Sequence, residues 1–274
     1  MTAIKKPALE LQTAVDYDEA AFAQTIGALS CMQSANQKAP VDAAISDYTG
    51  SGYELVPAEY GTTLDERAVK ETIKNAVLVL AEEVDFEEED CYVKPEIEDE
   101  NPKLLAAIDE LNSYVKTKIT YDFDVTKEVL DGETISGWLS VDDDFHVSVD
   151  EEAVSAYVKE LAGKYNTCYK PKTLKTSYGS NVTINNGPYG WKINNSEEVA
   201  QIIEEIKDGK EVEREPVYSQ RANSHGENDY GDSYVEINLT AQHLFLYKDG
   251  ELVTESDFVS GNVAKGHATP LCHL

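Results

Sequence analysis

The chain has 274 residues, of which 52 are acidic and 23 are basic, so its formal net charge at pH 7 is −29. A surface this acidic repels phosphates and anionic lipid headgroups, which argues against nucleic acid as a partner. Hydrophobic residues make up 41% of the chain, enough for buried cores in at least two domains. No run of about 18 apolar residues occurs, so we expect no membrane-spanning segment.

The first part of the chain predicts a module over residues 1–95. Residues 18–29, DEAAFAQTIGAL, begin with acidic side chains and place Phe22, Ile26 and Leu29 on one helical face. A second helix is predicted in ERAVKETIKNAVLVLAEE, after the Tyr60-Gly61 turn. Too few residues precede the first helix to match the second module described next, so we expect this module to be incomplete at its front.

A second module is predicted over residues 104–218. The acidic, proline-flanked residues 94–103 predict a linker before it. The module then shows a helix at residues 104–114, a strand in ITYDFDV, a helix at residues 150–161 and a helix in SEEVAQIIEEIK.

The two modules align with each other as an internal repeat. Residues 150–161 correspond to residues 18–29, Tyr189-Gly190 to Tyr60-Gly61, and Tyr218 to Tyr92. Each unit contains a helix, short strands, a Tyr-Gly turn and another helix, which predicts an α+β fold built from repeated helix/strand modules.

The last part of the chain predicts three β-strands within residues 232–274. Val235, Ile237 and Leu239 alternate with polar residues, residues 243–247 form an apolar run, and Asp249-Gly250 is a strong hairpin signal. Residues 252–259 complete the set as a third strand. Residues 219–233 lack periodicity and predict a connector.

These segments resemble a known family. Residues 234–270, which contain QHLFLYKDG, SGN and ATP, resemble the opening of the all-β catalytic domain of YkuD-type L,D-transpeptidases. The second module is similar to the peptidoglycan-binding domain that precedes it, through ITYDF, ISGWLSVD, KYNT, TSYG, YGWKI and REPVY. The resemblance implies peptidoglycan as the partner, an extracellular place in the cell wall, and acyl transfer by a cysteine without a metal or organic cofactor. Residues 1–15 lack the apolar region of an export signal.

The family's catalytic motif, Ser/Thr-His-Gly-Cys, does not occur in this sequence. Cys272 has no oriented base around it, and we do not expect it to be a nucleophile. We therefore expect no catalytic residue in this chain, which looks truncated before the motif. The predicted function is that of the wall-binding part of an L,D-transpeptidase-like cell-wall protein, inactive alone. Two alternatives remain open: a non-catalytic peptidoglycan-binding or scaffold protein, and an acidic calcium- or protein-binding module.

The Tyr-Gly-Trp-Lys turn is the best candidate for substrate binding. Tyr189 and Trp191 could stack on sugar rings, and Lys192 could meet a stem-peptide carboxylate. Alternatively, Tyr189 and Trp191 are core anchors and Gly190 permits a tight turn. The second interpretation is favoured, because Tyr60-Gly61 repeats the turn without the tryptophan and lysine.

The sequence shows no metal site. The four cysteines are Cys31, Cys91, Cys168 and Cys272. None forms a C-x-x-C pair, and we expect at least three of the four to be unpaired. Residues 142–144 are three aspartates, but the glycine and distal glutamate of a calcium loop are absent, so a solvated turn is predicted.

Overall fold

The computed structural model describes residues 16–185, 187–226 and 228–268. It has the predicted α+β class, with helices and several small sheets. The chain divides into two compact units. The first comprises residues up to Asp47 together with Glu54–Ile108, and the second comprises Tyr48–Tyr53 together with the residues from Asp109 onward. The predicted boundaries at 1–95, 104–218 and 232–274 stay a prediction.

The first unit is a small helical core with short strand pairings. Asp18 and Asp65 accept hydrogen bonds from backbone N–H groups at the starts of its two helices, which satisfies donors that a helix N-terminus leaves open. A cluster of four buried side chains joins the helices to the chain that follows: Ile26, Leu64, Val69 and Cys91. The elements are α1 (Glu19–Gly27), the 3-10 turns Ser30–Met32 and Ser34–Asn36, β1 (Ala44–Ile45), β2 (Leu55–Val56) and α2 (Glu66–Val79).

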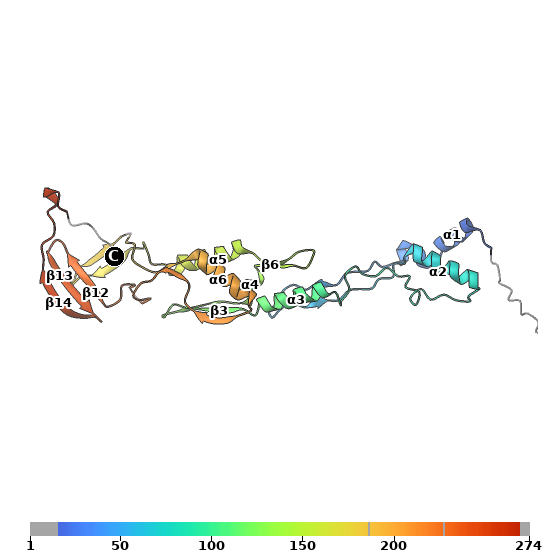
Figure 1. The fold of residues 1–274 in the computed structure, drawn as a ribbon, viewed down its shortest axis with the longest axis horizontal. Coiled ribbons are helices and arrows are strands. Elements are labelled where there is room, and N and C mark those ends of the chain that lie inside the picture. The colour runs from blue at the N-terminus through green and yellow to red at the C-terminus, as the bar shows by residue number, and fades with distance from the viewer. Residues whose placement is uncertain (1–15, 186, 227, 269–274) are drawn as a thin grey trace, which may run out of the picture. The chain divides into compact units, whose positions relative to one another are not determined.

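The second unit is built around a three-stranded sheet of order β10-β3-β4, in which β10 runs parallel to β3. Helices α5 and α6 lie together over one face of this sheet (Figure 1). Their apolar faces and the sheet share one core, which contains Tyr121, Phe123, Val158 and Ile202. Helix α3 (Pro102–Tyr114) begins in the first unit and ends in the second. The other bounds are β3 (Lys118–Asp122), β4 (Lys127–Leu130), α4 (Gly132–Ser136), β5 (Leu139–Val141), β6 (Val147–Val149), α5 (Glu151–Tyr165), α6 (Asn195–Lys207) and β10 (Glu211–Arg214).

A buried ion cluster fastens α6 to the sheet. The Arg214 guanidinium donates to Glu198 Oε1 at 2.8 Å and to Glu205 Oε1 at 2.9 Å. Tyr121 Oη donates to Glu198 Oε1 at 2.6 Å, and the backbone N–H of Val217 donates to Glu198 Oε2 at 2.6 Å. Both glutamate side chains are almost fully buried, so the guanidinium and these neutral donors, rather than water, stabilise the two negative charges.

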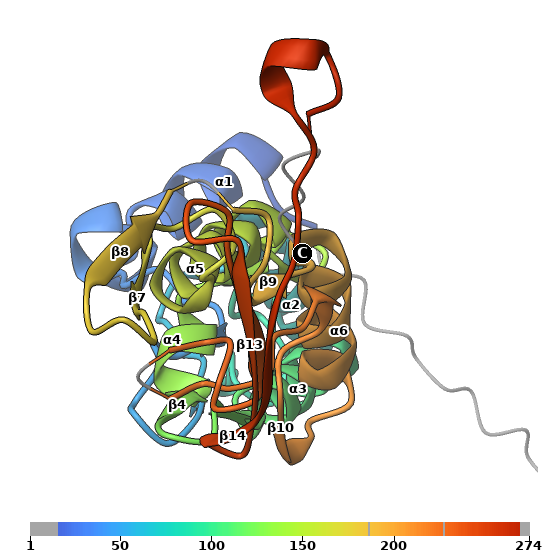
Figure 2. The same cartoon turned by 90° about the vertical axis from the view of Figure 1, so that its left-hand side faces the viewer.

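The remaining strands form three small sheets. A hairpin joins β7 (Lys172–Lys175) and β8 (Asn181–Ile184), and β9 (Lys192–Ile193) pairs with β11 (Tyr218–Gln220). The predicted C-terminal strands are confirmed as β12 (Tyr234–Asn238), β13 (His243–Lys248) and β14 (Glu251–Asp257), in sequential antiparallel order. β13 and β14 run side by side in Figure 2. Asp249 and Gly250 both have positive φ, as the hairpin signal predicts. A 3-10 turn follows at Val263–Lys265.

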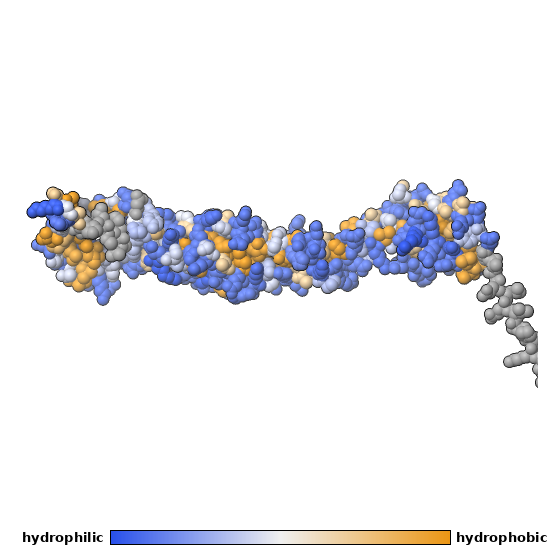
Figure 3. Space-filling model, turned by 45° about the horizontal axis from the view of Figure 1, so that its top comes forward, coloured by the Kyte–Doolittle hydropathy of each residue, from blue (hydrophilic) through white to orange (hydrophobic). Residues whose placement is uncertain are grey.

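Hydrophobic surface gathers over the β12–β14 sheet, whereas most of the visible surface is hydrophilic (Figure 3). Val235, Ile237, Leu252 and Val253 are each about half exposed there. Within the described residues, no helix combines the length and apolar character that crossing a membrane requires.

Candidate functional site

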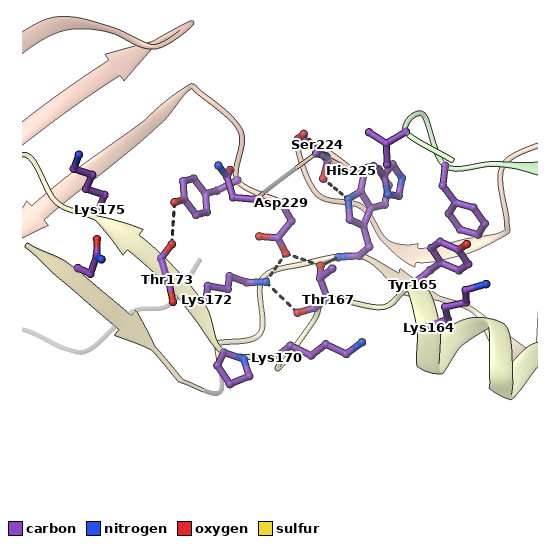
Figure 4. A pocket seen from close by; sticks show the side chains of 18 residues that line it. Lys164, Tyr165, Thr167, Lys170, Lys172, Thr173, Lys175, Ser224, His225 and Asp229 are labelled. Atoms are coloured by element: carbon purple, nitrogen blue, oxygen red, sulfur yellow. Dashed lines mark hydrogen bonds and ion pairs between the residues drawn. The ribbon is translucent and has the colours of Figure 1, made fainter. Parts of the chain in front are cut away.

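A cavity of about 710 Å³ lies in the second unit. Its walls come from the C-terminal end of α5, the β7–β8 hairpin and the connector before β12. Although the chain is acidic, four lysines line this cavity, and Asp229 is the one acidic residue among the described residues that line it (Figure 4). The lysines are Lys164, Lys170, Lys172 and Lys175. The cavity is therefore a local reversal of the overall charge, of a size that suits a small ligand.

Lys172 and Asp229 form a buried ion pair at the cavity wall. Lys172 Nζ contacts Asp229 Oδ2 and also donates to the Thr167 carbonyl oxygen at 3.0 Å (Figure 4). Thr167 Oγ1 donates to the same Asp229 oxygen at 2.5 Å. The other carboxylate oxygen, Asp229 Oδ1, is buried and has no hydrogen-bond partner among the described residues. Because an unpaired buried acceptor is costly, this oxygen is a place where a ligand N–H or ammonium group would be stabilised.

An aromatic wall closes another side of the cavity. The rings of Phe123 and Tyr165 stack with their centroids 3.6 Å apart, and those of Trp191 and His225 stack at 3.7 Å. His225 also meets the edge of Phe123. Trp191 Nε1 donates to the Ser224 carbonyl oxygen at 2.7 Å, which holds the connector against this wall. The cavity thus combines cationic, carboxylate and aromatic surfaces.

The three residues predicted from the sequence to bind substrate lie in different surroundings. Trp191 is 5% exposed and contributes to the cavity wall. Tyr189 is half-buried, and its hydroxyl accepts from the Asn223 backbone N–H at 3.0 Å and donates to the Asp229 carbonyl oxygen at 3.4 Å. Lys192 is exposed on β9 and does not line the cavity. Tyr189 and Trp191 therefore anchor the connector, and substrate binding by the three residues stays a prediction.

The position between Tyr189 and Trp191 requires glycine for a steric reason. Its φ is 142°, and a Cβ atom there would lie 2.5 Å from the Cys168 backbone nitrogen. Only glycine combines this backbone conformation with so close an approach.

Sequence reasoning missed the lysines of the cavity wall. The signal was present in Lys170-Pro171-Lys172-Thr173-Leu174-Lys175, a basic cluster in a chain with only 23 basic residues. It missed Asp229 as well, because the predicted connector carries many polar residues and nothing in its spacing distinguishes the one that becomes buried.

The other candidate groups show no assembled site. Cys31, Cys91 and Cys168 are free thiols, while Cys272 lies outside the described residues. Asp142 Oδ1 accepts the backbone N–H groups of Asp144 and His146, so this oxygen closes a turn. Among the described residues, no group of three or more His, Cys, Asp or Glu side chains could hold a metal ion.

His225 predicts a pH-dependent stability of the connector. Burial lowers the pKa of His225 below its ordinary value of 6.5. The negative charges of Asp124 and Glu215 act to raise this pKa, and the positive charge of Arg221 acts to lower it. The folded state therefore favours neutral imidazole, and the contribution of His225 to stability is present above pH 6.5 and declines as the pH falls towards its folded pKa.

Between about pH 7 and about pH 5.5, we expect the urea midpoint of the unmodified chain to fall further than that of His225→Gln. Tryptophan fluorescence measures both midpoints, because Trp191 stacks on His225. His243 provides a control of opposite sign, since its hydrogen bond to Asp257 raises the pKa of its imidazole and its contribution is lost as the pH rises. Equal pH slopes for the unmodified chain and His225→Gln would contradict the prediction.

A family model matches the part of the chain that lines much of this cavity. Residues 102–213 match the family model described as "Putative peptidoglycan binding domain". The comparison with curated proteins found no match.

Two solved structures are similar to the chain. A crystal structure of a cysteine-to-serine mutant of Enterococcus faecium L,D-transpeptidase shares 30% identity, covers 61% of this chain and 64% of its own, and has a TM-score of 0.46. The avibactam carbamoyl enzyme of Ldtfm shares 30% identity, covers 62% and 64%, and has the same TM-score. The chain thus spans less than two thirds of the length of either structure. The matches are therefore to a peptidoglycan-binding domain model over residues 102–213 and to parts of two L,D-transpeptidase structures.

Proposed function

We propose that this chain is the wall-binding part of an extracellular cell-wall protein of the L,D-transpeptidase kind, and that its partner is peptidoglycan. The observation that carries the proposal is the match of residues 102–213 to a peptidoglycan-binding domain. The cavity supports it, since Lys164, Lys172 and Trp191 lie within the matched range and line the same space.

Sedimentation with purified peptidoglycan sacculi tests this function. We expect the chain to pellet with the sacculi and to be released by soluble wall fragments. Because the chain carries a net charge of −29, overall charge attraction to an anionic wall cannot produce this result at low ionic strength. A chain that stays in the supernatant at both low and physiological salt would sink the proposal.

We further propose that the chain by itself does not catalyse transpeptidation, since its sequence contains no Ser/Thr-His-Gly-Cys motif. Incubation with a carbapenem is expected to leave its mass unchanged, because a nucleophilic thiolate needs a lowered pKa and an adjacent base. Intact-protein mass spectrometry measures this. A stable adduct that maps to Cys272, which lies outside the described residues, would contradict the prediction.

The internal repeat belongs to the proposal, and local pairings support it. Leu64 pairs with Tyr92 in the first unit, and Ile193 pairs with Tyr218 in the second, at the positions that the alignment equates. A Cβ atom on Gly61 would meet the Lys38 carbonyl oxygen, just as one on Gly190 would meet Thr167 and Cys168. Two modules of one kind would allow the chain to contact the wall at more than one point.

A further inference from the structure

Two lysines of the cavity keep charges that the described residues do not balance. Lys164 pairs with Glu128, and Lys172 pairs with Asp229. Lys170 donates to the Gly163 carbonyl oxygen at 3.0 Å, which leaves its charge uncompensated, and Lys175 is exposed on β7. Neither Lys170 nor Lys175 forms an ion pair within the described part of the chain. In a protein of net charge −29, these two ammonium groups offer an anionic group a local attraction.

Whereas the two lysines attract an anionic group, the carboxylate of Asp229 favours a hydrogen-bond donor or a positive charge on the ligand. Its side chain is 5% exposed, and its Oδ1 atom lacks a hydrogen-bond donor while Oδ2 is occupied by Lys172 and Thr167. A ligand that brings only negative charge, such as inorganic phosphate, would be repelled by this buried oxygen. A ligand that also carries an ammonium or N–H group would satisfy it.

We propose that this cavity binds a peptide end that presents a carboxylate to Lys170 and Lys175 and an amino group to Asp229 Oδ1. Such an end occurs on peptidoglycan stem peptides that carry a diamino acid, and the inference therefore rests on the proposed wall-binding function. The stacked rings of Phe123 and Tyr165 provide an apolar surface for the aliphatic part of the residue between the two charges. The cavity thus recognises the peptide of the wall through its paired charges.

Titration calorimetry with a soluble stem tripeptide, L-Ala-γ-D-Glu-L-Lys, tests the proposal in the full chain. The free tripeptide should bind, whereas its C-terminal amide and its side-chain N-acetyl derivative should each bind at least about tenfold more weakly. The double variant Lys170→Gln/Lys175→Gln should weaken binding of the free tripeptide to a similar extent. Lys159→Gln, an exposed lysine on α5 away from the cavity, is the matched control and should leave affinity within about twofold.

Asp229→Asn separates recognition from folding. The unmodified chain should distinguish the free amine from the acetylated one, and the variant should lose this discrimination even where its absolute affinity falls. Loss of discrimination supports the contact with Oδ1, and retained discrimination contradicts it. Circular dichroism shows whether each variant is folded. If Asp229→Asn does not fold, Lys170→Gln/Lys175→Gln still tests the inference, because it changes only exposed side chains.

Three outcomes would overturn the inference: equal affinity for the tripeptide and its amide, no effect of Lys170→Gln/Lys175→Gln, or displacement of the tripeptide by excess inorganic phosphate.

Failure of this inference is distinguishable from failure of the proposed function. A chain that pellets with sacculi but ignores the tripeptide binds the wall elsewhere, and Lys192→Gln then tests the Tyr189–Lys192 turn. A chain that does not pellet lacks the function itself.

Discussion

Replacing Arg214 by methionine is expected to lower the free energy of unfolding of the second unit by about 3–5 kcal/mol. Among the described residues, the Arg214 guanidinium is the only cation that forms ion pairs with both Glu198 and Glu205, and both carboxylates are buried. Burial acts to lower the pKa of Arg214, but the hydrogen bonds to Glu205 and Glu198 outweigh it and raise the pKa. Methionine fills similar space and leaves two buried carboxylates with neutral hydrogen-bond donors but without their cation. Urea denaturation followed by circular dichroism measures the change.

Two comparisons show whether the buried charges cause the loss. Arg221→Met removes an arginine whose ion pair with Glu215 is exposed, and it should cost less than about 1 kcal/mol. Adding Glu198→Gln and Glu205→Met to Arg214→Met should recover most of the lost stability, because glutamine still accepts from Tyr121 or Val217. If the triple variant were as unstable as Arg214→Met, lost packing rather than unpaired charge would explain the effect.

Replacing Gly190 by alanine is expected to lower the free energy of unfolding by roughly 2–5 kcal/mol, from the strain of a positive φ together with overpacking. The added Cβ would lie 2.5 Å from the Cys168 nitrogen and 2.6 Å from the Thr167 carbonyl carbon. These are backbone atoms, so relief requires the chain itself to move. Because Thr167 also contacts Lys172 and Asp229, we expect the variant to lose tripeptide binding as well.

Gly179→Ala is the matched control for this effect. Gly179 has a φ of 83°, but a Cβ atom there meets nothing within 4 Å. Only the conformational cost of roughly 1–2 kcal/mol remains, and the cavity should keep its affinity. Urea midpoints and calorimetry compare the two variants. A similar loss of stability and binding in both would show that the close approach at Gly190 has no special role.

Local patterns predicted much of the fold correctly. The helix at residues 150–161 was readable from its acidic start and apolar spacing, and the structure caps it at Asp150. The three C-terminal strands were readable because alternation and the Asp249-Gly250 turn are properties of adjacent residues. The resemblance to L,D-transpeptidases also came from contiguous motifs.

The cavity depends on contacts between distant residues, which periodicity does not report. Lys172 meets Asp229 across 57 positions, and Thr167 meets it across 62. Trp191 was selected as an exposed platform or a core anchor, and its burial against His225 was decided by how the connector folds back over β9 and β11.

The sequence by itself determined the α+β class, the strand order of the C-terminal segment and the resemblance to a wall-binding family, because each is encoded in neighbouring residues. Tertiary structure alone decided which of the lysines share a cavity and which carboxylate oxygen remains without a donor. The physical reason is that burial and charge pairing depend on the packing of segments far apart in the chain.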